Sequence, residues 1–321
     1  MTAKPDRAEL EAILAPIAAG RASARIEGAR ASIVLDVTGL EAAAREELEA
    51  DVKAAALSLP GIEEVRVLQT SERRTRKLIA VASGKGGVGK STVSANLAIA
   101  LAKAGRKVGL VDADIYGPSQ TRLMGVDGIR PKHREEKLIP VETAFGVPLL
   151  SMGGLVAEGQ AIAWRGPMAG SALGQLVDAE WGDHDLLVLD LPPGTGDVQL
   201  TMVQKHKPAG AVIVSTPQDL ALIDARRAID LFRRMDVPIL GLIENMAGYA
   251  CPHCGEVSNP FGKGGAEAAA EALGIPFLGR IPLELAIREA SDAGQPPAFG
   301  NGPGSQVFAD LAAKVSTAIG G

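Results

Sequence analysis

The ten residues from Ser83 to Thr92, Ser-Gly-Lys-Gly-Gly-Val-Gly-Lys-Ser-Thr, have the types and spacing of a phosphate-binding loop. Glycines let such a backbone approach phosphate oxygens closely, because a residue without a Cβ adopts positive φ at little cost. The pattern predicts that Lys90 reaches the β- and γ-phosphates of a nucleotide, that the Ser91 hydroxyl binds Mg²⁺, and that Thr92 bonds to a phosphate. The residues expected to contact the nucleotide are Gly84, Gly86, Gly87, Val88, Gly89, Lys90, Ser91 and Thr92.

The sequence on both sides of the loop supports this interpretation over a glycine-rich turn that binds nothing. Residues 78–82 are a short apolar run that predicts a buried parallel strand. Residues 91–104 predict a helix, since they are mostly small or apolar and include no proline. A strand, a glycine loop and a helix N-terminus together make an anion site, because unpaired backbone N–H groups and the helix dipole both point at the phosphate.

Three carboxylates at or just after the ends of predicted strands could complete the site. Residues 107–112 predict a strand that ends at Asp112 and is followed closely by Asp114, and residues 185–190 predict a strand that ends at Asp190. Open α/β sheets bind ligands at the carboxyl ends of their strands. We therefore expect Asp190 and Asp112 to hold Mg²⁺ and Asp114 to position the water that attacks the γ-phosphate. The alternative is that these side chains cap the next helix or prevent edge pairing.

Cys251 and Cys254 are the only cysteines in the chain, and their C-x-x-C spacing suits a metal site, thiol redox chemistry or no function. The surrounding prolines and glycine predict a loop, whereas a redox pair would begin a helix after a strand. Two thiolates cannot close a four-ligand zinc or iron–sulfur site, so the missing ligands could come from a second copy of the chain. His253, between the cysteines, is a further possible ligand. Zinc and iron–sulfur both remain open, because both accept thiolates.

The phosphate loop contains a second lysine, Lys85, and in this it resembles the deviant Walker A group, which includes MinD, ParA, the arsenite-pump ATPase and the nitrogenase iron protein. The C-x-x-C pair narrows the resemblance to the Mrp/ApbC-type iron–sulfur cluster carriers, since MinD and ParA lack it. The similarity covers residues 77–321. The other segments that resemble this family are residues 111–119 (switch I), 164–168, 190–197 (Walker B and switch II), 244–246 and 261–265.

The resemblance implies a homodimer that binds ATP and Mg²⁺, hydrolyses ATP, and works with cluster assembly factors to load a [4Fe-4S] cluster onto iron–sulfur apoproteins. The C-x-x-C cysteines of both subunits would bridge that cluster. Lys85 would reach across the dimer to the partner's nucleotide and offset transition-state charge, and the alternative is a solvated loop lysine. Asn245 would contact the adenine edge, or else cap a turn, and Pro282 and Leu283 would pack on the base.

Residues 1–69 predict a separate small α+β domain, and residues 70–77 a charged linker to the larger domain at 78–321. The stretch around Leu59-Pro60-Gly61 resembles the domain that precedes many Mrp-type proteins and occurs in other iron–sulfur assembly factors. Ala15-Pro16 replaces the family's usual Asp-Pro and the domain has no cysteine, so we expect docking or regulation rather than cluster binding. The elements expected here are helices over 7–19 and 40–59 and strands over 22–26, 31–37 and 61–68.

Composition agrees with an α/β fold in which a mostly parallel sheet is flanked by helices, as in a P-loop NTPase. Apolar residues make up 46% of the 321 residues but aromatic residues only 3%, so Ala, Val, Leu and Ile must fill the core. Residues 127–137 are highly charged and predict a mobile insertion. The further expected elements are strands over 211–215, 237–243 and 276–281 and helices over 219–235, 265–273 and 305–319.

The net charge of −5 argues against a surface built for nucleic acid, although residues 226–234 place four arginines on one predicted helix. Aspartates interleave with these arginines, which favours a salt-bridged solvated face. We expect no membrane span and no signal peptide, and two cysteines without a disulfide framework fit a reducing cytoplasm. The open alternatives are a MinD/ParA-like positioning ATPase, which needs a basic tail or face, and a zinc-stapled dimer without cluster transfer.

Overall fold

The structure is a computed structural model that describes residues 6–40, 42–70, 76–134, 137–155, 166–251 and 253–320. The chain divides into two compact units, residues 1–75 and 76–321, and each is described by itself. The linker predicted over 70–77 falls largely outside the described residues, because 71–75 are not described.

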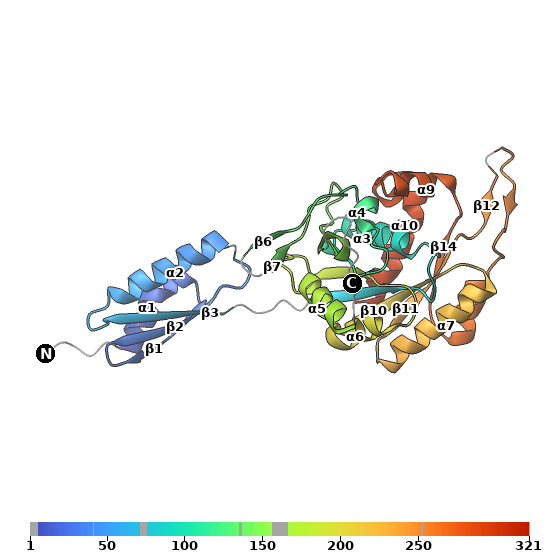
Figure 1. Cartoon of the computed structure of the whole chain (residues 1–321). Helices are drawn as coiled ribbons and strands as arrows, with labels where there is room; N and C mark the ends of the chain where they lie inside the picture. The colour runs from blue at the N-terminus through green and yellow to red at the C-terminus, as the bar shows by residue number, and fades with distance from the viewer. Residues whose placement is uncertain are drawn as a thin grey trace. The chain divides into compact units, whose positions relative to one another are not determined.

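The first unit is a three-stranded sheet with two helices, in the order helix, strand, strand, helix, strand (Figure 1). Its strands lie in the order β1-β2-β3, with β1 and β2 antiparallel and β2 and β3 parallel. All five elements predicted from the sequence are confirmed here, with ends that differ by a few residues. They are α1 (Arg7–Ala18), β1 (Ala22–Glu27), β2 (Arg30–Asp36), α2 (Ala42–Leu57) and β3 (Glu64–Thr70).

The core of this unit lies between the helices and one face of the sheet. Burial alternates along β2, where Ala31, Ile33 and Leu35 are buried and their neighbours are more exposed. This is the period of two that a strand with one covered face produces. Leu10 and Leu14 of α1 belong to the same apolar cluster, as do residues of α2. The unit is therefore a two-layer α+β structure, as predicted.

A seven-stranded parallel sheet forms the centre of the second unit (Figure 1). Its order is β14-β11-β10-β4-β9-β5-β8, so β4, which precedes the phosphate loop, lies in the middle. Its inner strands are apolar and almost entirely buried, because helices cover both faces. The predicted α/β class with a parallel sheet is confirmed. The strands are β4 (Lys77–Ala82), β5 (Val108–Asp112), β8 (Leu149–Ser151), β9 (Leu186–Asp190), β10 (Gly210–Ser215), β11 (Ile239–Asn245) and β14 (Phe277–Ile281).

Helices on the two faces of this sheet enclose two separate apolar clusters. One face is covered by α3 (Lys90–Lys103) and α10 (Pro303–Ala318), with α4 (Gln120–Leu123) and α9 (Leu285–Asp292) at its edge. None of the helices in the described part of the chain could cross a membrane. The other face is covered by α5 (Gly166–Val177), α6 (Asp197–His206), α7 (Asp219–Arg234) and α8 (Gly265–Leu273).

Two small antiparallel strand pairs also occur among the described residues of this unit. The charged segment predicted as an insertion contributes β6 (Lys132–Arg134), which pairs with β7 (Lys137–Ile139) in an antiparallel ladder. The second, a hairpin, pairs β12 (Tyr249–Ala250) with β13 (Val257–Ser258), and it projects away from the main sheet (Figure 1). It follows β11 directly, and it carries the C-x-x-C motif between its strands.

Candidate functional site

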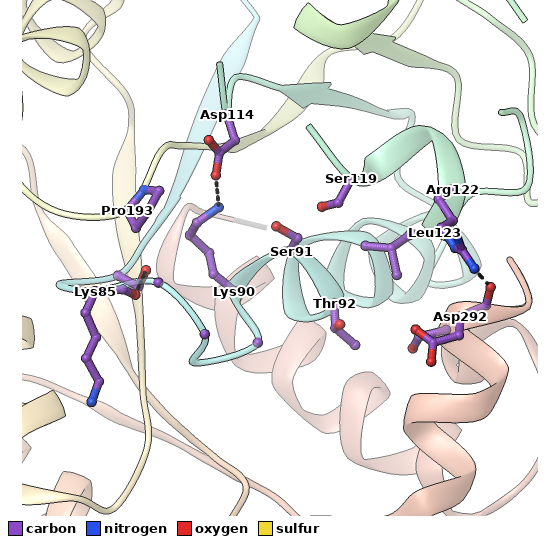
Figure 2. A pocket seen from close by; sticks show the side chains of 15 residues that line it. Lys85, Lys90, Ser91, Thr92, Asp114, Ser119, Arg122, Leu123, Pro193 and Asp292 are labelled. Carbon is purple, nitrogen blue, oxygen red and sulfur yellow. Dashed lines mark hydrogen bonds and ion pairs between the residues drawn. The ribbon is translucent and has the colours of Figure 1, made fainter. Parts of the chain in front are cut away.

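The loop between β4 and α3 adopts the backbone that its glycines predict. Gly87 and Gly89 have φ values of +79° and +81°, in the left-handed region that other residues rarely adopt. A cavity of about 300 Å³ opens over this loop and the start of α3, and Ser91 and Thr92 line it (Figure 2). The cavity therefore lies at a helix N-terminus, where unpaired N–H groups favour an anion.

Helix α7 and the end of strand β11 pack closely against this loop. A Cβ added to Gly84 would overlap the backbone of Asp224 in α7, so the loop and this helix touch main chain to main chain. A Cβ added to Gly89 would overlap the amide of Asn245 at the end of β11. Both glycines are thus required by close packing as well as by any need to approach a phosphate.

Lys90 is buried against two of the predicted carboxylates. Its Nζ lies 2.6 Å from Oδ1 of Asp190 and 3.9 Å from Oδ2 of Asp114. Figure 2 shows the lysine directed at Asp114 across the upper part of the cavity. Only 6% of the lysine side chain is exposed, so its charge must be matched by these anions. The structure therefore brings the predicted cation and two of the three predicted carboxylates together.

Asp190 at the end of β9 is fully buried, and both of its carboxylate oxygens accept hydrogen bonds. Its Oδ1 accepts from Lys90 Nζ and from Ser94 Oγ, the latter at 2.8 Å. Its Oδ2 accepts from Nε2 of Gln120 at 2.8 Å. The Ser91 and Asp114 side chains line the cavity and carry hard oxygen atoms of the kind that Mg²⁺ prefers, whereas Asp190 is not among the described residues that line it.

Asp112 is the strand neighbour of Asp190 and is also fully buried. Its Oδ2 accepts from the backbone N–H groups of Ser119 and Gln120, each at 3.1 Å, and from Ser151 Oγ at 2.9 Å. The helix-capping alternative therefore describes its contacts, because the two N–H groups begin α4. Burial and the adjacent Asp190 carboxylate raise the pKa of Asp112 to about 7.

Asp114 borders the cavity from the loop that follows β5. Its Oδ1 accepts from the N–H groups of Tyr116 and Gly117 at 3.1 and 3.2 Å. These two bonds fix the carboxylate and leave Oδ2 as the oxygen nearer Lys90. Such a fixed, partly accessible acceptor could orient a water molecule in the cavity.

Lys85 has a different environment from Lys90. Its backbone carbonyl accepts from Ser83 Oγ at 2.9 Å, which holds the loop, while the side chain is half-exposed. Figure 2 shows the Lys85 side chain directed away from Lys90. The ammonium group is therefore available to something outside this cavity.

The residues predicted to contact the adenine base lie beside the loop and the cysteine hairpin. Asn245 donates from Nδ2 to the carbonyl of Val88 at 2.8 Å and is buried. Pro282 and Leu283 follow β14 and are half-buried, and the Leu283 N–H donates to Gly248 at 2.9 Å. None of these three residues is among the described residues that line the cavity, so their contact with the base stays a prediction.

The hairpin carries both thiols at its tip. The Cys251 N–H donates to Glu256 at 2.9 Å, and the Gly255 N–H donates back to the Cys251 carbonyl at 2.8 Å. Backbone N–H groups of Cys254 and His253 point at the Cys251 sulfur and lower the pKa of its thiol. Cys254 is exposed. Within the described ranges, no group of three His, Cys, Asp or Glu side chains could hold a metal ion.

The sequence analysis did not identify Ser94 and Gln120, the two further side chains that donate hydrogen bonds to Asp190. Ser94 lies one helical turn after Lys90, so its position was readable once the helix was predicted. Gln120 had no signal of that kind, because only the packing of α4 against α3 brings it to Asp190. In the family segment predicted over 164–168, residues 164 and 165 lie outside the described residues, as does Pro252 within the C-x-x-C motif.

Comparison with known proteins gives consistent matches over most of the chain. A family model described as ParA: NUBPL iron-transfer P-loop NTPase matches residues 74–316. A Pseudomonas fragi protein named iron-sulfur cluster carrier protein is 50% identical over 242 residues, which are 74% of this chain and 84% of the relative. An Arabidopsis thaliana protein named iron-sulfur protein required for NADH dehydrogenase, mitochondrial, is 51% identical over 255 residues, covering 77% of this chain and 81% of the relative.

Solved structures show the same similarity. A nucleotide-binding protein from Archaeoglobus fulgidus, solved in complex with ADP, has a TM-score of 0.61 and 42% identity over 70% of this chain and 89% of its own. The cell division ATPase MinD from Pyrococcus furiosus has a TM-score of 0.56 and 26% identity over 75% of this chain and 98% of its own.

Proposed function

The chain belongs to the NUBPL iron-transfer P-loop NTPases of the ParA type, and on this premise we propose that it carries iron–sulfur clusters to apoproteins in an ATP-dependent cycle. The observation that carries the proposal is that one unit holds both a phosphate loop with a buried Lys90–Asp190 pair and a projecting hairpin with two reduced thiols. Relatives about half identical to this chain are named as cluster carriers, which supports the same cargo here.

The nucleotide half of the cycle uses the cavity over the loop. The donor set fits Mg²⁺ and a nucleotide, since oxygen ligands and a buried cation surround a helix N-terminus. We propose that Ser91 and Asp190 hold the ion, that the loop glycines and Thr92 bind the phosphates, and that Lys90 neutralises their charge. Bound Mg²⁺ would neutralise charge on the transferring phosphoryl group. Asp114 would orient the attacking water.

Asp112 was predicted as a magnesium ligand, and its contacts support a position one layer further from the nucleotide. Both of its oxygens accept hydrogen bonds from backbone N–H groups, and Oδ2 accepts three bonds in all, whereas the Asp190 carboxylate, among the described residues, accepts only from side chains, which can turn aside for an ion. We propose that it ties the start of α4 to the strand that carries the site, so that Asp112 acts on the metal through its neighbours. Asn245 and the loop of Pro282 and Leu283 remain the proposed adenine contacts.

The cargo half of the cycle uses the hairpin. The pKa of the Cys251 thiol is lowered, which favours the thiolate that binds iron. A [4Fe-4S] cluster needs four such ligands, and each chain offers two. We propose that two chains form a symmetric homodimer and bridge one cluster, and that Lys85 contacts the partner's nucleotide. The thiols must stay reduced for this role, so a reducing compartment such as the cytoplasm suits the protein.

Anaerobic reconstitution with iron and sulfide tests the proposal. The wild-type protein should become brown, and Cys251→Ala and Cys254→Ala should each stay colourless, because either change removes two of four ligands from a symmetric site. Both variants should still bind ADP, whereas Lys90→Ala should keep the cluster and lose ATP hydrolysis. Cluster delivery to an apoprotein should vanish in the cysteine variants.

A different result would point to a different metal. A colourless wild-type protein that holds stoichiometric zinc after the same treatment would contradict the carrier function and support a zinc-stapled dimer. Loss of ADP binding in the cysteine variants would contradict the separation of the two halves of the site.

A further inference from the structure

Gln120, the first residue of α4, joins three parts of the nucleotide site. Its side-chain Nε2 donates to Oδ2 of Asp190 at 2.8 Å and to the carbonyl of Ser91 at 3.0 Å. Its backbone N–H donates to Asp112 at 3.1 Å. One residue thus connects β9, the start of α3 and the end of β5.

The orientation of the Gln120 amide follows from its surroundings. Both groups within reach of Nε2 are acceptors, a carboxylate and a carbonyl, so the NH₂ end must face them. The other end, Oε1, is buried, and it has no hydrogen-bond partner among the described residues. The residue as a whole is fully buried.

A buried amide oxygen without a donor is unfavourable, and proteins rarely keep one without a reason. An aliphatic side chain of similar size would fill the same space without that cost. The unpaired oxygen belongs to an amide whose other end donates to Asp190, a proposed magnesium ligand, and to the backbone carbonyl of Ser91, whose hydroxyl is the other proposed ligand. The unpaired oxygen is therefore best explained by what the other end of the amide holds, the Asp190 carboxylate.

We propose that Gln120 is a positioning residue for the magnesium ion, which rests on the function proposed above. Its Nε2 holds the Asp190 carboxylate in place for the ion. Groups that orient metal ligands in this way typically change metal affinity by about 10- to 100-fold when they are removed.

The experiment measures Mg²⁺ and ADP binding to the full chain without any cluster. Gln120→Met replaces the amide with an apolar chain of similar length, and Gln120→Leu is a second variant with a different shape. ADP affinity is measured in EDTA, and the apparent Mg²⁺ dissociation constant is then measured at saturating ADP. In both variants we expect the Mg²⁺ constant to rise about 10- to 100-fold while the ADP affinity in EDTA stays within about twofold.

A purely structural role predicts the opposite pattern. If Gln120 only anchors α4, the variants lose ADP affinity equally with and without Mg²⁺, and the Mg²⁺ constant stays at its wild-type value, which would overturn the proposal. A variant that folds and binds Mg²⁺ and ADP like the wild type would overturn it as well. Urea unfolding followed by tryptophan fluorescence identifies a variant that has not folded, and the other variant then decides the question.

The failure of this inference and the failure of the proposed function are distinguishable. If wild-type ADP binding does not depend on Mg²⁺, the nucleotide half of the proposed function is wrong and Gln120 has no ion to position. If wild-type binding depends on Mg²⁺ and the variants match it, only the role of Gln120 is wrong. A zinc-loaded hairpin would leave this test unchanged, since the test needs no cluster.

Discussion

Replacing Gly89 by alanine tests how closely the end of β11 packs on the phosphate loop. The glycine has a φ of +81°, and an added Cβ would overlap Nδ2 of Asn245. That amide is the donor to the buried Val88 carbonyl at 2.8 Å. An alanine therefore has two effects, because it strains the backbone and it displaces the amide from the carbonyl.

The two effects have separate magnitudes. A non-glycine residue in the left-handed region costs about 1–2 kcal/mol. A buried carbonyl left without its donor costs about 1–3 kcal/mol more. We expect Gly89→Ala to reduce the free energy of unfolding by about 2–5 kcal/mol, the sum of both effects. Gly87→Ala is the matched control, since Gly87 has a φ of +79° and open space around its Cβ position. It should show only the first, smaller cost.

Urea unfolding without nucleotide, followed by tryptophan fluorescence, measures these values. The two tryptophans are Trp164 and Trp181, so the signal reports on the unit that contains the loop. The slope of free energy against urea concentration should be the same in all variants, which shows that the same surface unfolds.

A double-mutant cycle with Asn245→Ala isolates the contact. Once the amide is absent, Gly89→Ala should cost only its backbone strain, so the coupling between the two substitutions should be about 1–3 kcal/mol. Additive effects, or equal costs for Gly87→Ala and Gly89→Ala, would refute the packing described here.

Two further predictions concern the dimer and the thiols. Lys85→Ala and Asp190→Ala chains should each be inactive alone and should regain partial ATPase activity when they are mixed. In a mixed dimer, one site has both an intact Asp190 and an intact Lys85 from the partner. No recovery despite proven subunit exchange would rule out action of Lys85 across the interface. The pKa of the Cys251 thiol is lowered from 9.0, so its thiolate persists to a lower pH than usual. Its alkylation by iodoacetamide, followed by mass spectrometry across pH, should have a midpoint below 9.0. In Cys254→Ala the midpoint should rise but stay below 9.0, because the hydrogen bond from the Cys254 side chain is lost while those from the backbone N–H groups remain. A midpoint at 9.0 in the wild type would contradict this.

Local sequence patterns predicted the parts of the site that lie on continuous segments. The phosphate loop, its strand and its helix are adjacent in sequence, and each strand-end aspartate follows an apolar run. For these segments the pattern determines the local backbone, and the parallel sheet then brings the strand ends to one edge. Lys90, Asp114 and Asp190 were therefore found together as expected.

Contacts between distant segments could not be predicted in the same way. Gln120 reaches Asp190 across 70 positions, and nothing near either residue encodes that approach. Asn245 was interpreted from a family resemblance as a contact to the base, and its bond to Val88 depends on the packing of β11 against the loop, 157 positions away. The charged segment was predicted as a mobile insertion, and its charge content could not predict that residues 132–134 would pair with residues 137–139.

The bond between Asn245 and Val88 has a mechanical consequence. Asn245 ends β11, and the chain continues through the left-handed residues Met246 and Gly248 straight into the hairpin that reaches Cys251. Only five residues lie between Asn245, whose amide touches the phosphate loop, and Cys251, the first thiol, a span of at most about 20 Å. If a nucleotide displaced Val88 when it bound, the hydrogen bond to Asn245 would move the end of β11, from which the hairpin continues. The path from the phosphate loop to the first thiol would then consist of one hydrogen bond and a short stretch of backbone, and it would not cross the core.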